Sequence, residues 1–232
     1  MNQDSLLKRI TLTCVLTIIS LSGLALWGWV SNSLIFASLN QNFIPMAPST
    51  ALVFIVAGAA LFVNRYTAKS PLAKIFVFAA LFLLLSVCVL ILIRSLSGKG
   101  GDVERWVSFH PASAHFTFLN SRTPIGRMSP VTAANFLLVA LSFFLITGFR
   151  NKRRAREAAA VLSVFVILFA SVIILSYLYG MPLLYGGSII PVALTTGMAF
   201  FFLGIGLIIA VGTDMWPLSL FLGVSICARL MR

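Results

Sequence analysis

APSTALVF, at residues 47–54, is the stretch of sequence that decides the fold, because the chain repeats it twice. The second copy reads SPVTAANF at residues 129–136, and a looser third copy reads ALTTGMAF at residues 193–200. Each copy opens an apolar segment. Recurrence of this kind predicts a chain built from repeats of one supersecondary unit.

The copies share a row of small residues with one phenylalanine. At about 100° per residue, four aligned positions of each copy fall on one stripe of a helix. Lipid tails are as apolar as leucine, so helices in a bilayer associate through close backbone approach, which small residues four apart permit. We therefore interpret each stripe as a helix-packing surface. These positions are Ala47, Ala51, Phe54 and Gly58; Ser129, Ala133, Phe136 and Ala140; and Ala193, Gly197, Phe200 and Gly204.

The composition is that of a membrane protein. Hydrophobic residues make up 60% of the chain and charged residues 9%, and the mean hydropathy is +1.05. Such a chain cannot maintain a soluble surface. Its 232 residues leave room for about six or seven spans and no separate soluble domain.

The apolar segments predict an all-α bundle of six transmembrane helices in a single domain, residues 1–232. Each pair of spans, one outward and one inward, forms a hairpin, and the three hairpins have the same orientation, as in parallel repeats. The units are predicted at about 8–64, 72–150 and 157–213, and residues 214–232 as an interfacial helix or a truncated seventh span. The predicted spans are 10–30, 48–63, 75–96, 130–149, 158–179 and 191–211.

The charge of +12 is carried by 17 lysines and arginines that gather at the ends of the apolar segments. Most of them fall on one predicted side, the densest run being residues 150–156. This asymmetry predicts that both termini are cytoplasmic and argues against nucleic-acid binding. The same run could also attract anionic lipid, although orientation alone would explain it.

The long connection between the third and fourth spans holds the candidate ligand contacts. Three inward helices are expected to begin at the outer face, where their positive ends could gather around an anionic or polar ligand. Arg122 and Arg127 would assist, with His110 and His115 as further contacts. Because Pro111 separates the two histidines and no Cys pair is present, we expect no metal site.

No other pattern predicts chemistry. The chain has five acidic residues, unclustered, so we expect no enzyme activity, no catalytic residue and no cofactor. The predicted span interiors contain no His for haem and no Asp, Glu, Lys or His for ion transport. Asn135 is the most polar deep residue, and we expect it to form a hydrogen bond between helices.

Residues 45–52, 126–133, 182–187 and 228–230 resemble the N-terminal multi-span regions of bacterial membrane-bound sensor proteins. In that family the membrane region precedes cytoplasmic PAS, histidine-kinase or diguanylate-cyclase domains. The resemblance implies a location in the bacterial inner membrane. No output domain is present here, and the further spans expected after Arg229 are missing, so kinase or cyclase activity would lie outside these residues.

Three functional hypotheses follow. The first is a transmembrane sensory or anchoring module that passes a periplasmic or intramembrane signal to a cytoplasmic signalling domain, in cis or in a partner; its partners would include membrane lipid and a second copy in a homodimer. The second is a small repeat-built transporter, channel or lipid-handling protein. An assembly partner without a ligand is a third reading. A continuous polar path or a lipid-sized cavity along the repeat axis would favour the second hypothesis.

Overall fold

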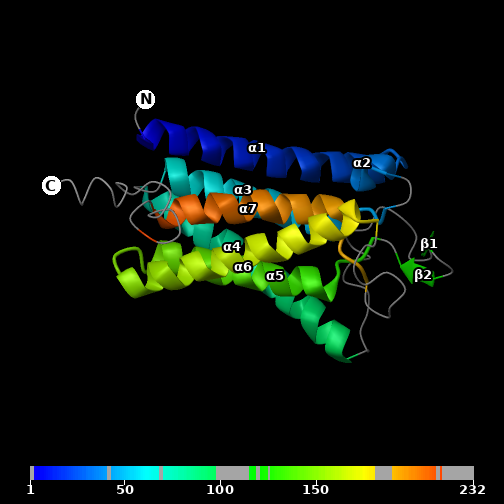
Figure 1. Ribbon diagram of the computed structural model, residues 1–232. Coiled ribbons are helices and arrows are strands. Elements are labelled where there is room, and N and C mark those ends of the chain that lie inside the picture. The colour runs from blue at the N-terminus through cyan, green and yellow to red at the C-terminus, as the bar shows by residue number, and fades with distance from the viewer. Residues whose placement is uncertain are drawn as a thin grey trace.

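The computed structural model describes residues 3–40, 43–67, 70–97, 115–118, 121–124, 126–180, 190–212 and 215. Six helices in these residues are long and apolar enough to cross a membrane. The prediction of an all-helical membrane bundle is thereby confirmed (Figure 1). The long helices are α1 (Gln3–Val30), α3 (Pro48–Tyr66), α4 (Pro71–Ser97), α5 (Pro130–Gly148), α6 (Arg153–Leu178) and α7 (Leu194–Val211).

Four helices extend beyond the apolar runs that predicted them: α3 by three residues, to Tyr66, α4 by four at its start, from Pro71, and α1 and α6 by more. α1 begins at Gln3 rather than at residue 10, and α6 begins at Arg153 rather than at residue 158. Lysine, arginine and glutamate are good helix formers, so a charged segment next to a span continues the helix. In α6 the Arg153 Nε donates to Glu157 Oε1 over 2.9 Å, one turn along.

Two of the three inward helices begin at a proline. Pro48 and Pro130 are the first residues of α3 and α5, a position that needs no backbone N–H. The Ser129 side chain accepts a hydrogen bond from the Val131 backbone N–H. α7 begins at Leu194, three residues later than predicted, and the Val192 carbonyl before it accepts from the Tyr177 hydroxyl over 2.9 Å.

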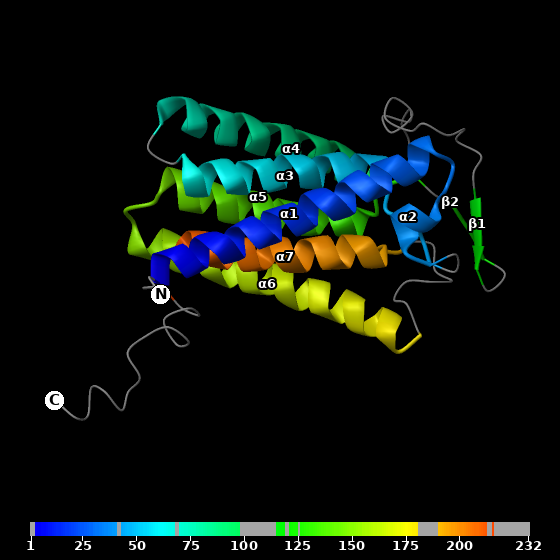
Figure 2. The same cartoon turned by 90° about the horizontal axis from the view of Figure 1, so that it is seen from above.

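The long helices alternate in direction. In Figures 1 and 2, α1, α4 and α6 run from the end near the N-terminus to the opposite end, and α3, α5 and α7 return. Each outgoing helix packs against the helix that follows it, in the pairs α1–α3, α4–α5 and α6–α7. The three pairs therefore point the same way. The origin of the pairs as sequence repeats stays a prediction.

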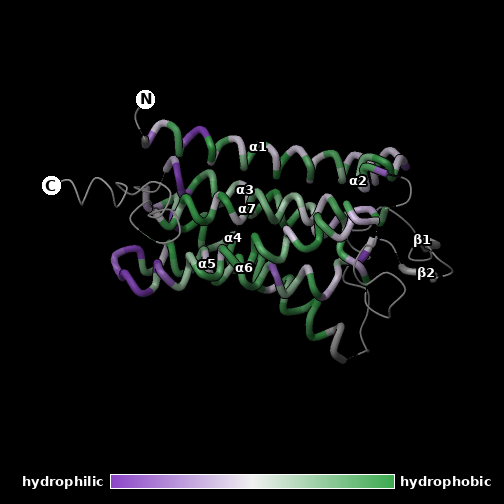
Figure 3. Tube along the Cα trace, viewed as in Figure 1, coloured by the Kyte–Doolittle hydropathy of each residue, from purple (hydrophilic) through white to green (hydrophobic). Residues whose placement is uncertain are grey.

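Hydrophilic residues mark one end of the bundle, most densely between α5 and α6 (Figure 3). We call this the basic end, and the other the far end. The start of α1 and the end of α7 both lie at the basic end. Its described cations are Lys8, Arg9, Arg65, Lys74, Arg150, Lys152, Arg153, Arg154 and Arg156.

Three aligned phenylalanines meet at the centre of the bundle. The ring centroid of Phe54 lies 4.7 Å from that of Phe136 and 4.7 Å from that of Phe200. Phe136 and Phe200 complete the triangle at 4.6 Å. All three side chains are 0% exposed. We call this group the phenylalanine triangle; it fills the space where α3, α5 and α7 converge.

Small residues bring the helices close around the triangle. A Cβ built on Gly204 would lie 2.5 Å from Ile167 Cγ1 of α6, and one on Gly206 would overlap Leu61 of α3. Ser142 of α5 occupies the position aligned with Gly206. Its hydroxyl forms hydrogen bonds with Ala159 O and Ser163 Oγ of α6, at 3.1 and 2.9 Å. The α5–α6 contact is thus partly polar.

Asn135 lies on α5 next to the triangle and is 3% exposed. Neither its Oδ1 nor its Nδ2 has a hydrogen-bond partner among the described residues. The expected bond to another helix is therefore wrong. At the positions aligned with Asn135, α3 has Val53 and α7 has Ala199. Both side chains are apolar and cannot form a hydrogen bond with the amide.

The far end is packed with side chains from the connection after α1. Met46 is 0% exposed, and its carbonyl accepts from the Trp29 indole N–H over 2.8 Å. Thr195 Oγ1 donates to Ala37 O at 3.0 Å, so the start of α7 is joined to α2 (Ile35–Ser38). Gly126, at φ +83°, lies against the Trp29 ring, where a Cβ would be 3.1 Å away.

The described part of the long far-end connection contains a β-hairpin that the sequence analysis did not predict. β1 (His115–Phe118) pairs antiparallel with β2 (Ser121–Pro124), with Thr117 opposite Arg122. The predicted C-terminal segment, 214–232, lies outside the described residues except for Met215, which is buried.

Candidate functional site at the basic end

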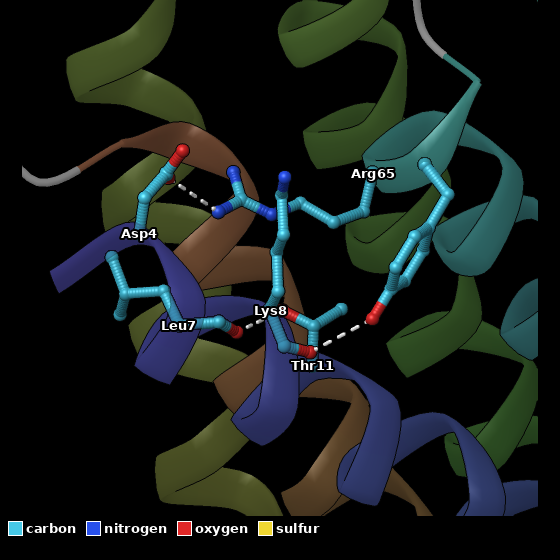
Figure 4. Close-up of polar contacts among 6 residues, drawn as sticks. Asp4, Leu7, Lys8, Thr11 and Arg65 are labelled. Atoms are coloured by element: carbon cyan, nitrogen blue, oxygen red, sulfur yellow. Dashed lines mark hydrogen bonds and ion pairs between the residues drawn. The ribbon is translucent and has the colours of Figure 1, made fainter. Parts of the chain in front are cut away.

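An ion pair and a hydrogen bond join α1 to α3 at the basic end. Arg65 Nη2 lies 3.0 Å from Asp4 Oδ1, and Figure 4 shows the Arg65 side chain reaching from α3 to α1. One residue further on, the Tyr66 hydroxyl donates to Lys8 O over 3.1 Å. Both contacts use the last turn of α3, which is thereby held against the first turns of α1.

An arginine of α6 caps the end of α7. Arg156 Nε and Nη2 donate to the Val211 carbonyl at 2.9 and 2.7 Å. The last carbonyls of a helix have no partner within it, and a cation there is favoured by the helix dipole. The first turn of α6 thus fixes the last residue of α7.

A cavity of about 340 Å³ opens between the end of α3, the start of α4 and the α5–α6 connection. Val77 and Ala73 of α4 form part of its apolar wall and are buried. We call it the basic-end cavity. Its polar lining residues are Asn64, Lys74, Thr147, Arg150, Asn151 and Lys152.

A second, smaller cavity of about 40 Å³ shares two residues with the first. Asn64 and Arg150 line both, and Arg65, Ile146 and Ala210 complete the smaller one. It therefore lies where the ends of α3, α5 and α7 come together. The buried Nε of Arg65 has no hydrogen-bond partner among the described residues.

The described lining of the basic-end cavity offers donors and positive charge. Lysine, arginine, amide and hydroxyl groups face it, and no carboxylate, histidine or thiol is among them. Across the described part of the chain, no three His, Cys, Asp or Glu side chains are grouped closely enough to hold a metal ion. A donor set of this kind suits an anion with several acceptor oxygens.

The predicted packing residues all lie inside the bundle. The small residues and phenylalanines of the three stripes are all buried. Gly197 faces Ile173 of α6, to which a Cβ would be 3.0 Å, and Gly58 faces Ile18 and Ile19 of α1 at 3.5 Å. The stripes thus contact outgoing helices as well as one another.

Of the predicted ligand contacts at the far end, only Arg127 has a side chain among the described ones. Arg127 is exposed, just before α5. Arg122 and His115 belong to the β-hairpin, on opposite strands, and their side chains are outside the description, as is all of His110. The starts of α3, α5 and α7 do lie at one end of the bundle (Figure 1). A ligand site there stays a prediction.

Comparisons with protein-family models, with curated proteins and with solved structures found no match for this chain. Its function is therefore argued from its own residues. The six apolar helices make it a multi-pass membrane protein.

Sequence reasoning missed the residues that form the basic-end cavity. In the sequence, Lys74, Arg150 and Lys152 indicate only membrane orientation, and no pattern marks Asn64 or Thr147. Their positions at the inner ends of predicted spans were the available signal. Hydropathy and charge counts cannot show that α4 and the α5–α6 connection face one cavity.

Proposed function

We propose that this chain is the membrane sensory or anchoring module of a signalling protein, with its basic end in the cytoplasm. A change at the far end or within the bilayer would shift the packing of α3, α5 and α7, and that shift would reach a signalling domain in cis or in a partner. The observation that carries the proposal is the closed centre of the bundle.

A conduit needs space along its axis, whereas the axis here is occupied. The phenylalanine triangle fills the place where the three inward helices converge, with ring centroids 4.6–4.7 Å apart and no exposed surface. Close-packed interfaces rearrange between discrete arrangements rather than deforming continuously. This packing supports a module that transmits a helix shift over one that passes a solute.

The contacts at the basic end offer a route for such a shift. Arg156 connects α6 to the end of α7, after which the chain continues towards residues 216–232. A displacement of α6 would be passed through this junction to the end of α7 and onward along the chain. We infer that this segment joins or contacts the signalling domain.

The alternative is a lipid-handling protein, and one observation favours it. An apolar cavity of about 200 Å³ lies between α3 and α4, lined by Leu52, Val56, Leu83 and neighbouring residues. Leu52 and Leu83 are exposed, at 42% and 52%. An acyl chain could occupy this space. It lies at the rim of the bundle rather than along its axis.

The test uses Ala133 and Ala134, which are adjacent on α5. Ala133 is 0% exposed, whereas Ala134 is exposed on the surface of the bundle. The signalling domain is identified first, by reading the gene past the Arg232 codon and by chemical cross-linking of the native protein to its partners. The output of that domain is then assayed. Three separate variants at buried positions are expected to change that output: Ala133→Leu, Ala51→Leu and Gly197→Leu. The matched control, Ala134→Leu, is expected to leave it unchanged.

Unchanged output and assembly in the three buried variants would contradict the mechanism. Absence of any signalling domain in the gene product or its cross-linked partners would contradict the function itself. Saturable lipid or solute transport by the protein in liposomes would favour the alternative.

A further inference from the structure

We propose that the basic-end cavity is a binding site for the phosphate group of an anionic phospholipid. The site is independent of whether the protein signals, because it rests only on the cavity, its charges and its apolar border. Three cations from two parts of the chain line one cavity: Lys74 comes from the first turn of α4, and Arg150 and Lys152 come from the α5–α6 connection.

None of these three cations forms an ion pair with a carboxylate in the described part of the chain. The described carboxylates are engaged elsewhere: Asp4 pairs with Arg65, and Glu157 pairs with Arg153. Lys152 Nζ lies 5.2 Å above the Phe149 ring, a contact that orients the ammonium group without neutralising it. The cavity therefore holds positive charge that an anion would compensate.

A buried hydroxyl points to the same ligand chemistry. Thr147 lines the cavity, and its Oγ1 is buried without a hydrogen-bond partner among the described residues. Leaving such a group unpaired is costly, whereas a phosphate oxygen would accept its hydrogen bond. Asn64 adds amide donors beside it. The donors and charges together match the several acceptor oxygens of a phosphate group.

The border of the cavity favours a lipid over a free phosphate ion. Gly148 lines the cavity, and a Cβ on it would lie 3.9 Å from the Phe78 ring. Phe78 contacts Phe144, and Phe144 contacts Phe149, with ring centroids 6.4 and 5.7 Å apart. These three rings are 36–43% exposed. They form a continuous apolar surface from the cavity along α4 and α5, where acyl chains would lie while the head group occupies the cavity.

The experiment measures lipid binding to the full chain by native mass spectrometry of protein released from detergent. The probes are phosphatidylglycerol, which is anionic, and phosphatidylcholine, whose phosphate is balanced by an ammonium group. The test variant is Arg150→Gln/Lys152→Gln, and the matched control is Arg153→Gln/Arg154→Gln. Both remove two positive charges from the same run, but residues 153 and 154 do not line the cavity.

The wild-type chain is expected to retain one phosphatidylglycerol in preference to phosphatidylcholine. A cation at an anionic lipid surface contributes about fivefold in affinity, so the test variant should lose about thirtyfold. The control should lose less than about threefold, because its side chains do not line the cavity and act on the lipid only through screened, longer-range attraction. Equal losses in the two variants would mean diffuse attraction to the basic run and would overturn the site.

Two further arms keep the proposal testable if the double variant fails to fold. Thr147→Val keeps the side-chain shape and all charges, and is expected to weaken phosphatidylglycerol binding by about tenfold; unchanged binding would overturn the role of the hydroxyl. Thermal unfolding with inorganic phosphate, against chloride at equal ionic strength, distinguishes the sources. Protection by inorganic phosphate without retention of phosphatidylglycerol would overturn the lipid assignment.

Discussion

Replacing Gly204 by alanine is expected to destabilise the bundle, whereas the same change at the aligned Gly58 is expected to stabilise it. At position 204 the new Cβ would lie 2.5 Å from Ile167 Cγ1 and 3.4 Å from the Ile167 backbone N. At position 58 the nearest atoms are Ile18 Cγ2 and Ile19 Cγ1, both at 3.5 Å, which is ordinary contact.

Both positions lie in helix interiors, and they differ in the space available to a new Cβ. In a helix interior, alanine is favoured over glycine by about 1 kcal/mol. Overpacking a filled core costs about 1–3 kcal/mol, and it applies at position 204 alone. Gly58→Ala should therefore raise the free energy of unfolding by up to about 1 kcal/mol, and Gly204→Ala should lower it by about 1 kcal/mol.

The assay is reversible unfolding in mixed micelles by increasing the fraction of a denaturing detergent, followed by circular dichroism. The difference between the two variants is the measured quantity, because it cancels the common helix propensity. Gly204→Ala as stable as Gly58→Ala would refute the close approach of α6 and α7.

Two further changes follow from single contacts. Asn135→Leu replaces an unpartnered buried amide with its apolar isostere, so the free energy of unfolding should rise by about 1–3 kcal/mol in the same assay; a loss of stability would mean that the amide has a partner. Arg156→Gln removes two charge-assisted bonds to Val211 O and should lower stability by about 1.5–3 kcal/mol, with faster hydrogen exchange in the last turn of α7. Unchanged exchange there would contradict the capping role.

Much of the fold could be predicted from hydropathy because the bilayer imposes it. A span must satisfy its backbone hydrogen bonds internally, so long apolar runs can only be helices, and the runs located all six. The ends were less accurate, since charged residues such as Arg153 continue a helix without adding hydropathy. The hairpin at residues 115–124 was missed although Phe116 and Phe118 alternate with a polar residue, a strand pattern.

Packing partners could be predicted only in part. The helical period places Phe54, Phe136 and Phe200 on their stripes, but it cannot say that the three rings meet. The same limit explains Asn135: the period places it inside, and only the three-dimensional structure shows that no described donor or acceptor is opposite it. The basic-end cavity depends on residues from three separate segments, which no local pattern connects.

Whether the centre of the bundle is closed can be tested by measuring the interaction free energy between the Phe54 and Phe136 side chains. A double-mutant cycle with Phe54→Leu and Phe136→Leu isolates the interaction between the two rings, whose centroids are 4.7 Å apart. A coupling of about 0.5–1.5 kcal/mol is expected. A control cycle pairs Phe54→Leu with Phe82→Leu, because Phe82 is 76% exposed on α4, and it should show none. A Phe54–Phe136 coupling no larger than the control would contradict a bundle closed by the phenylalanine triangle.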